Sequence, residues 1–269
     1  MTSLSCAASV RHSGLALKLH PAQLARYTVF LSAPTIVASL LLTQFYPKRF
    51  RIHPYPYLSD AGLRDPERFI LSGGMAISAA LFLPLVAAIY LHYSHSLPST
   101  QIDHPLSRHL PPLQNFLPRL SLLSGILLSL FLALFTSVPG FWIPHHVFAA
   151  LFALSAGTWS VCVAVMSHVQ GRRKPRLAYL CALVQLIVIV SFAMLWISLR
   201  LRIPFALIPN KDPRFVYMAL LEYVGTTAFL TSIILAAQKV SGWHISLRLY
   251  RDRPSHDKTR PDSFTTIPL

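Results

Sequence analysis

Residues 53–93, HPYPYLSDAGLRDPERFILSGGMAISAALFLPLVAAIYLHY, join a short polar segment to a long apolar one. Three prolines and a glycine are too closely spaced in the polar part for a helix to form before Asp65. Asp65-Pro66-Glu67 predicts a helix start, because Asp can cap free N–H groups and Pro at the first helical position has no N–H to lose. About 25 uncharged residues follow, enough to cross a hydrocarbon core of roughly 30 Å. The stretch therefore predicts an extramembrane loop attached to a membrane-spanning helix.

The composition of the whole chain indicates a protein that is mostly embedded in lipid. Hydrophobic residues make up 54% of the 269 residues and charged residues only 12%, which excludes an ordinary soluble domain of this length. The formal net charge is +15, but the basic residues lie in short clusters between apolar segments. This pattern favours membrane orientation and contact with anionic headgroups, and we expect no nucleic-acid partner.

Six apolar segments predict an all-α fold, the six-helix transmembrane bundle of a polytopic integral membrane protein. The expected spans are residues 27–45, 69–93, 120–138, 141–166, 177–199 and 215–237. The chain then divides into three parts, namely a basic N-terminal segment 1–26, the membrane domain 27–240 and a flexible basic tail 241–269.

Lys and Arg are distributed unevenly between the two sides of this topology. The connections on the side of the termini hold 15 of the 24 basic residues, and the opposite connections hold 9. Because the more basic side normally faces the cytosol, we expect both termini to be cytosolic and the 46–68 loop to face the lumen or the exterior.

Small residues on two spans predict close helix packing, because small side chains let backbones approach in lipid. The two sets are Ser72, Gly73, Ala76 and Ala80 of the second span and Ala149, Ala153 and Gly157 of the fourth.

Glu222 is the only Asp, Glu, Lys or Arg inside the six predicted spans. An ionisable group in hydrocarbon costs from about 2.5 kcal/mol upward, so Glu222 needs a partner or a pocket. It lies about 10 Å from the outer end of the sixth span, and His145 and His146 lie about 6 to 8 Å from the outer end of the fourth. The similar depth allows a contact between Glu222 and a histidine.

Three interpretations of these groups are open. In the first, Glu222 is protonated or hydrogen-bonded to a histidine and ties the fourth span to the sixth. In the second, a lumen-facing cavity closed by the first loop holds a lipid headgroup or a glycan. Its candidate binding residues are Tyr57, Ser59, Asp60, His145, His146 and Glu222. The third is a metal-dependent hydrolase, but adjacent histidines on a helix point about 100° apart and seldom bind one ion. We therefore expect no metal and no cofactor.

The loop sequence YPYLSDAG, followed directly by DPERF, resembles the first-loop signature of the DRAM/Frag/Sfk-like family of six-helix eukaryotic membrane proteins. That family includes CWH-type N-terminal domains, GPI-anchor remodelling proteins and autophagy modulators. Further positions similar to the family are His146, Phe148, Ala149, Phe152, Glu222 and Tyr223. The resemblance covers about residues 27–240, whereas the basic N-terminal extension and the proline-rich second loop depart from it.

The resemblance implies an endomembrane protein that acts in membrane-lipid or GPI-anchor lipid handling, without an evident catalytic centre. Its expected partners are membrane lipids, including GPI-anchor lipid or anionic headgroups. An autophagy or lysosomal regulator of the same family, acting by protein or lipid interaction, is the first alternative. An intramembrane lipid hydrolase or acyltransferase is the second. The expected compartment is the Golgi or endoplasmic reticulum, with the lysosome or vacuole and the plasma membrane as alternatives.

Overall fold

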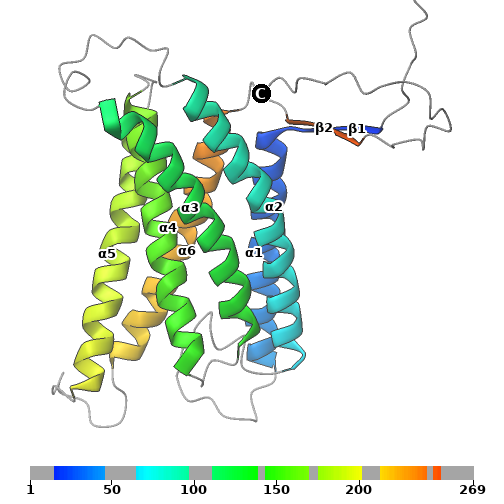
Figure 1. Cartoon of the computed structure of the whole chain (residues 1–269). Helices are drawn as coiled ribbons and strands as arrows, with labels where there is room; N and C mark the ends of the chain where they lie inside the picture. Colours follow the sequence, from blue (N-terminus) through cyan, green and yellow to red (C-terminus); the bar gives the residue numbers. More distant parts are fainter. Residues whose placement is uncertain are drawn as a thin grey trace, which may run out of the picture. The chain divides into compact units, whose positions relative to one another are not determined.

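The structure is a computed structural model that describes residues 15–45, 65–96, 111–138, 143–169, 175–201, 213–240 and 245–249. In this part of the chain six helices are long and apolar enough to cross a membrane (Figure 1). They are α1 (Pro21–Phe45), α2 (Glu67–Ser96), α3 (Pro111–Ser137), α4 (Ile143–Val169), α5 (Pro175–Arg200) and α6 (Pro213–Lys239). The predicted all-α, six-helix transmembrane fold is confirmed.

Most of the helices extend beyond the apolar segments that predicted them. Four of the six begin at a proline, namely Pro21, Pro111, Pro175 and Pro213. Proline is tolerated in the first helical turn, where its missing N–H would have no intrahelical partner. The helices therefore continue into polar sequence that hydropathy alone assigns to loops.

The start of α2 differs by one residue from the prediction. The N–H groups of Phe69 and Ile70 donate to the carbonyl oxygen of Pro66, at 3.1 and 3.3 Å. Pro66 therefore occupies the N-cap position, and Glu67 is the first helical residue. The expectation that Asp65 caps this helix and that Pro66 opens it was wrong, because the chain enters the helix one residue later. Glu67 still places a carboxylate in the first turn, where the helix dipole favours negative charge.

The six helices pack in chain order, and α6 also contacts α1, so that the bundle closes on itself (Figure 1). Helix α6 makes further contacts with α2 and α4 across the interior. Helices α2, α4 and α6 begin at one end of the bundle, which we call the first-loop end, and finish at the other, the terminal end. A hydrogen bond from Arg68 to the carbonyl oxygen of Ser137 joins α2 to α3 at the first-loop end, and one between the hydroxyls of Tyr93 and Ser167 joins α2 to α4 at the terminal end.

An aromatic cluster fills the middle of the bundle. The rings of Phe82, Trp159 and Phe229, from α2, α4 and α6, meet edge to face with centroids 5.1 to 6.3 Å apart. Phe152 of α4 lies against Phe229 at 6.0 Å. Phe82 and Trp159 are almost completely buried, and this geometry is favourable for aromatic pairs. The cluster separates a first-loop half of the interior from a terminal half.

Only part of the predicted small-residue packing occurs. A Cβ atom at Gly73 would meet open space, and Ala76 and Ala80 are exposed, so the predicted face of α2 points outward. The neighbouring Gly74 makes the close contact instead, because a Cβ atom there would overlap the side chain of Thr35 on α1. On α4 the prediction is confirmed for Gly157, where a Cβ atom would lie 2.9 Å from Ile189 of α5.

Two short strands complete the described residues. Strand β1 (Leu15–Leu19) pairs with β2 (Ile245–Leu249) in a two-stranded sheet. The chain forms two compact units, residues 20–245 with the helices and residues 1–19 with 246–269. From the sequence, residues 1–26 were expected to form a basic segment and residues 241–269 a flexible tail, and the sheet was not predicted. The sequence ISLRL of β2 alternates apolar and polar residues, as strands do, but such a short run is a weak signal and its partner lies more than 200 residues away.

Candidate functional site

His145 lies in the first turn of α4, where its side chain is buried, hydrogen-bonded and packed against another helix. Its side chain is only 3% exposed, and its Nδ1 lies 2.9 Å from the carbonyl oxygen of Val138. Since a carbonyl can only accept, Nδ1 carries the proton. The ring also packs on Phe135 of α3, with centroids 4.7 Å apart. His145 therefore holds the start of α4 against the end of α3.

His146 has a different environment from its neighbour. Its side chain is exposed, and its ring is nearly perpendicular to that of His145, with centroids 5.6 Å apart. This divergence is what an α-helix imposes on adjacent residues. In the described part of the chain, no group of three His, Cys, Asp or Glu side chains is placed to hold a metal ion.

Glu222 belongs to the inward face of α6. It shares that face with Phe229 and Ile233, which are seven and eleven residues further along and are both buried. One turn earlier, Met218 and Ala219 form a small core cluster. Glu222 is half-buried and lies nine residues after Pro213, about 14 Å along the helix from its start. Its side chain is thus well inside the first-loop half of the bundle.

The other predicted site residues, Tyr57, Ser59 and Asp60, lie outside the described residues. Their approach to Glu222 stays a prediction, as does a contact between Glu222 and a histidine. The structure brings His145 and His146 together at the start of α4 and places Glu222 deeper, on α6.

Two buried charged residues at the same end were missed by the sequence analysis. Glu67 is only 6% exposed, and its Oε2 has no hydrogen-bond partner in the described structure. Arg214 is 9% exposed, and its Nη1 lies 3.5 Å from Ser198 Oγ on α5. From the sequence, Glu67 was assigned only to the start of a helix, and Arg214 was only counted among the basic residues of the connection before the sixth span. The spacing of residues could have indicated that Arg214 is buried. Arg214, Met218 and Glu222 are four residues apart and therefore share one face of the helix.

The terminal half of the interior contains mainly hydroxyl and amide side chains, with the buried imidazole of His92 at its end. Ser160 on α4 donates to Oε1 of Gln185 on α5, and Nε2 of Gln185 donates to Ser232 on α6, both at 3.1 Å. The Tyr93 hydroxyl lies 2.9 Å from that of Ser167, which joins α2 to α4. Gln185 was also missed, although it is the only amide in the apolar run LCALVQLIVIV. These bonds tie four helices together.

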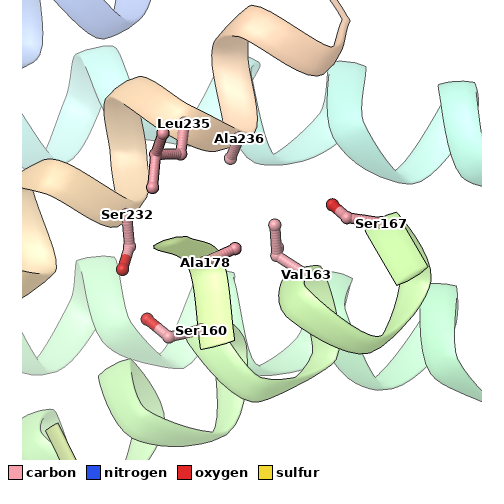
Figure 2. Close-up of a pocket in the computed structure, with 7 residues that line it drawn as sticks. All are labelled: Ser160, Val163, Ser167, Ala178, Ser232, Leu235 and Ala236. Atoms are coloured by element: carbon pink, nitrogen blue, oxygen red, sulfur yellow. The ribbon is translucent and has the colours of Figure 1, made fainter. Parts of the chain in front are cut away.

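A small cavity lies beside this network, between α4, α5 and α6 (Figure 2). Its volume is about 20 Å³. The residues that line it are Ser160, Val163, Ser167, Ala178, Ser232, Leu235 and Ala236. A cavity of this size accommodates a water molecule and excludes any headgroup.

Comparison with known proteins identifies the family. The family model described as the Frag1/DRAM/Sfk1/Cwh43P N-terminal domain matches residues 24–238. No curated protein and no solved structure matches the chain. The matched range runs from the first turn of α1 to the last turn of α6. It contains α2 to α5 completely and nearly all of α1 and α6. This chain is therefore a member of the Frag1/DRAM/Sfk1/Cwh43P N-terminal domain family, and it is an integral, multi-pass membrane protein.

Proposed function

We propose that this protein acts in membrane-lipid or GPI-anchor lipid handling at endomembranes, through a polar pocket in the first-loop half of the bundle. The observation that supports the proposal most is the position of Glu222, which is half-buried on the inward face of α6. A carboxyl group about 14 Å inside a membrane helix is costly, and ionisable residues in such positions commonly mark functional sites.

The other charges at this end fit a lipid headgroup. A guanidinium group such as that of Arg214 can bind a phosphate through paired hydrogen bonds. A carboxylate such as that of Glu67 or Glu222 can accept hydrogen bonds from hydroxyl or ammonium groups. In the proposal, Tyr57, Ser59, Asp60 and His146 complete the pocket from the first loop and from α4, while His145 supports it by holding the start of α4 against the end of α3.

The aromatic cluster supports access from one side only. Phe229 follows Glu222 by seven residues, about 10 Å along α6, and packs with Phe82 and Trp159 across the interior. A headgroup bound at Glu222 would therefore reach the site from the first-loop end. We propose that this end faces the lumen, because the opposite connections carry more Lys and Arg.

Labelling at Ala61 tests this orientation. In an Ala61→Cys variant, an impermeant thiol reagent should react only from the lumenal side, and tags at both termini should be accessible only from the cytosol. Labelling of this position from the cytosol would contradict the proposed topology.

Deletion of the gene tests the function itself. The proposal predicts a changed surface level of GPI-anchored proteins, a changed lipid on their anchors or an altered membrane phospholipid profile. The wild-type chain should restore these properties, and so should Thr227→Val, a control on the exposed side of α6. Unchanged lipids and anchors, with a defect confined to autophagy or the lysosome, would contradict lipid handling and favour a regulator that acts by interaction.

A further inference from the structure

The hydroxyl groups that line the cavity in the terminal half have unused hydrogen-bonding capacity. Ser160 donates its proton to Gln185 Oε1, at 3.1 Å. Ser232 accepts from Gln185 Nε2 at 3.1 Å and donates to the carbonyl oxygen of Ala228 at 3.0 Å. Because a hydroxyl group has one proton and two lone pairs, these bonds leave two lone pairs on Ser160 and one on Ser232.

The same amide group fixes both hydroxyls. Its oxygen contacts Ser160 and its nitrogen contacts Ser232, so the two serines are held on either side of one planar group. Both serines also line the cavity, whereas Gln185 does not (Figure 2). The cavity is therefore in contact with the two hydroxyl groups and not with the Gln185 amide.

The volume of the cavity limits the ligand to the size of a water molecule. A water molecule needs about 10 to 15 Å³ of cavity, and about 20 Å³ is present. Buried waters in proteins make at least two hydrogen bonds to groups that would otherwise lack partners. Two serine oxygens with free lone pairs meet this requirement, and no larger polar ligand fits.

We propose that one water molecule binds in this cavity and donates hydrogen bonds to Ser160 Oγ and Ser232 Oγ. The water, the two serines and the Gln185 amide then form a closed ring that connects α4, α5 and α6. Cys181 also interacts with Ser232, but toward the sulfur the Ser232 hydroxyl acts as a donor, so its remaining lone pair stays available to the water. Ser167 lies about 10 Å further along α4 and stays outside the ring, bonded to Tyr93.

This water site is independent of the proposed lipid function, because it lies on the other side of the aromatic cluster from Glu222. Its expected role is to hold α4 and α6 together beside the direct bonds of Gln185. A bridging water is nearly as favourable as a direct hydrogen bond.

X-ray radiolysis of the full chain in lipid nanodiscs tests the site, because bound water yields hydroxyl radicals that oxidise the adjacent side chains. Val163 lines the cavity and is 4% exposed, whereas Val86 is 1% exposed and does not line it. The two valines have the same intrinsic reactivity. We expect Val163 to be oxidised several times faster than Val86, and equal rates would overturn the proposal.

The variant Ala236→Val provides a second test, because it adds two methyl groups at the cavity wall. If water is bound, the added methyl groups displace it, oxidation of Val163 falls to the rate of Val86, and the unfolding temperature decreases. An unchanged Val163 rate, or a higher unfolding temperature from filling a dry cavity, would contradict the proposal. If this variant does not fold, the comparison of the two valines in the wild-type chain still decides the question.

Discussion

The two halves of the bundle interior carry different kinds of polar groups. The first-loop half contains the charged residues Glu67, Arg214 and Glu222, all buried or half-buried. The terminal half contains hydroxyl groups and the Gln185 amide, joined at 2.9 to 3.1 Å, together with the buried imidazole of His92. Oε2 of Glu67, by contrast, has no hydrogen-bond partner in the described residues. The hydroxyl and amide groups are therefore explained as ties between helices, whereas the buried Oε2 atom of Glu67 is not explained by a bond within the described residues.

The difference has an energetic basis. A neutral hydroxyl or amide in the membrane is stabilised once it finds a partner, and such bonds hold helices together. A charged group costs more to bury and is retained mainly where a function requires it. We therefore expect substitutions in the terminal half to change stability, and substitutions in the first-loop half to change activity at nearly constant stability.

The largest loss of stability is expected at the aromatic cluster between the two halves. Trp159 is fully buried against Phe82 and Phe229, so Trp159→Ala should cost about 3 to 5 kcal/mol of unfolding free energy. Trp196→Ala on the outer side of α5, where the side chain is 39% exposed, is the matched control. Cellular abundance and thermal unfolding in nanodiscs measure the effect, and equal losses in the two variants would contradict the assigned core.

A smaller loss is expected at the network of the terminal half. Gln185→Leu removes the partner of both Ser160 and Ser232, and the expected cost is about 1 to 2 kcal/mol. Activity per folded molecule should stay normal. Gln238→Leu, at an exposed position of α6, should leave both stability and activity unchanged. A Gln185→Leu protein that is stable but inactive would break the comparison, because it would place function in the terminal half.

The variant Glu67→Gln should show the opposite effect, a loss of activity at normal stability. The amide keeps the size of the side chain and avoids burying a charge, so stability should change by less than about 1 kcal/mol. If the carboxylate receives hydrogen bonds from a headgroup, complementation should be lost at normal abundance. Asp65→Asn, just outside the same helix, is the control and should complement fully. Normal complementation by Glu67→Gln would remove this residue from the proposed pocket.

The sequence was sufficient to predict the fold because the fold depends on long apolar runs. Six such runs predicted six helices, and the first-loop signature predicted the family. The face that each helix turns inward is set by its neighbours instead. Gly73 and Gly74 are adjacent, yet only Gly74 packs closely on another helix, because successive residues point about 100° apart.

The candidate site was predictable only in part. Glu222 was found because a carboxylate inside an apolar run is conspicuous. Glu67 and Arg214 lie at helix starts, where charged residues are common, so only the folded structure shows that they are buried. The bonds of Gln185 to Ser160 and Ser232 join residues that are 25 and 47 positions apart, and no local pattern specifies them.

Glu222→Gln tests most directly whether the first-loop half is a binding site. A residue that only ties helices should tolerate this change, since the amide retains hydrogen-bonding capacity. A carboxylate that meets a ligand should not. Abundance, location and complementation should be measured together for Glu222→Gln and for the control Thr227→Val. We predict that Glu222→Gln is normally abundant and correctly located but fails to restore lipid or GPI-anchor handling. A fully functional Glu222→Gln protein would contradict the proposed pocket.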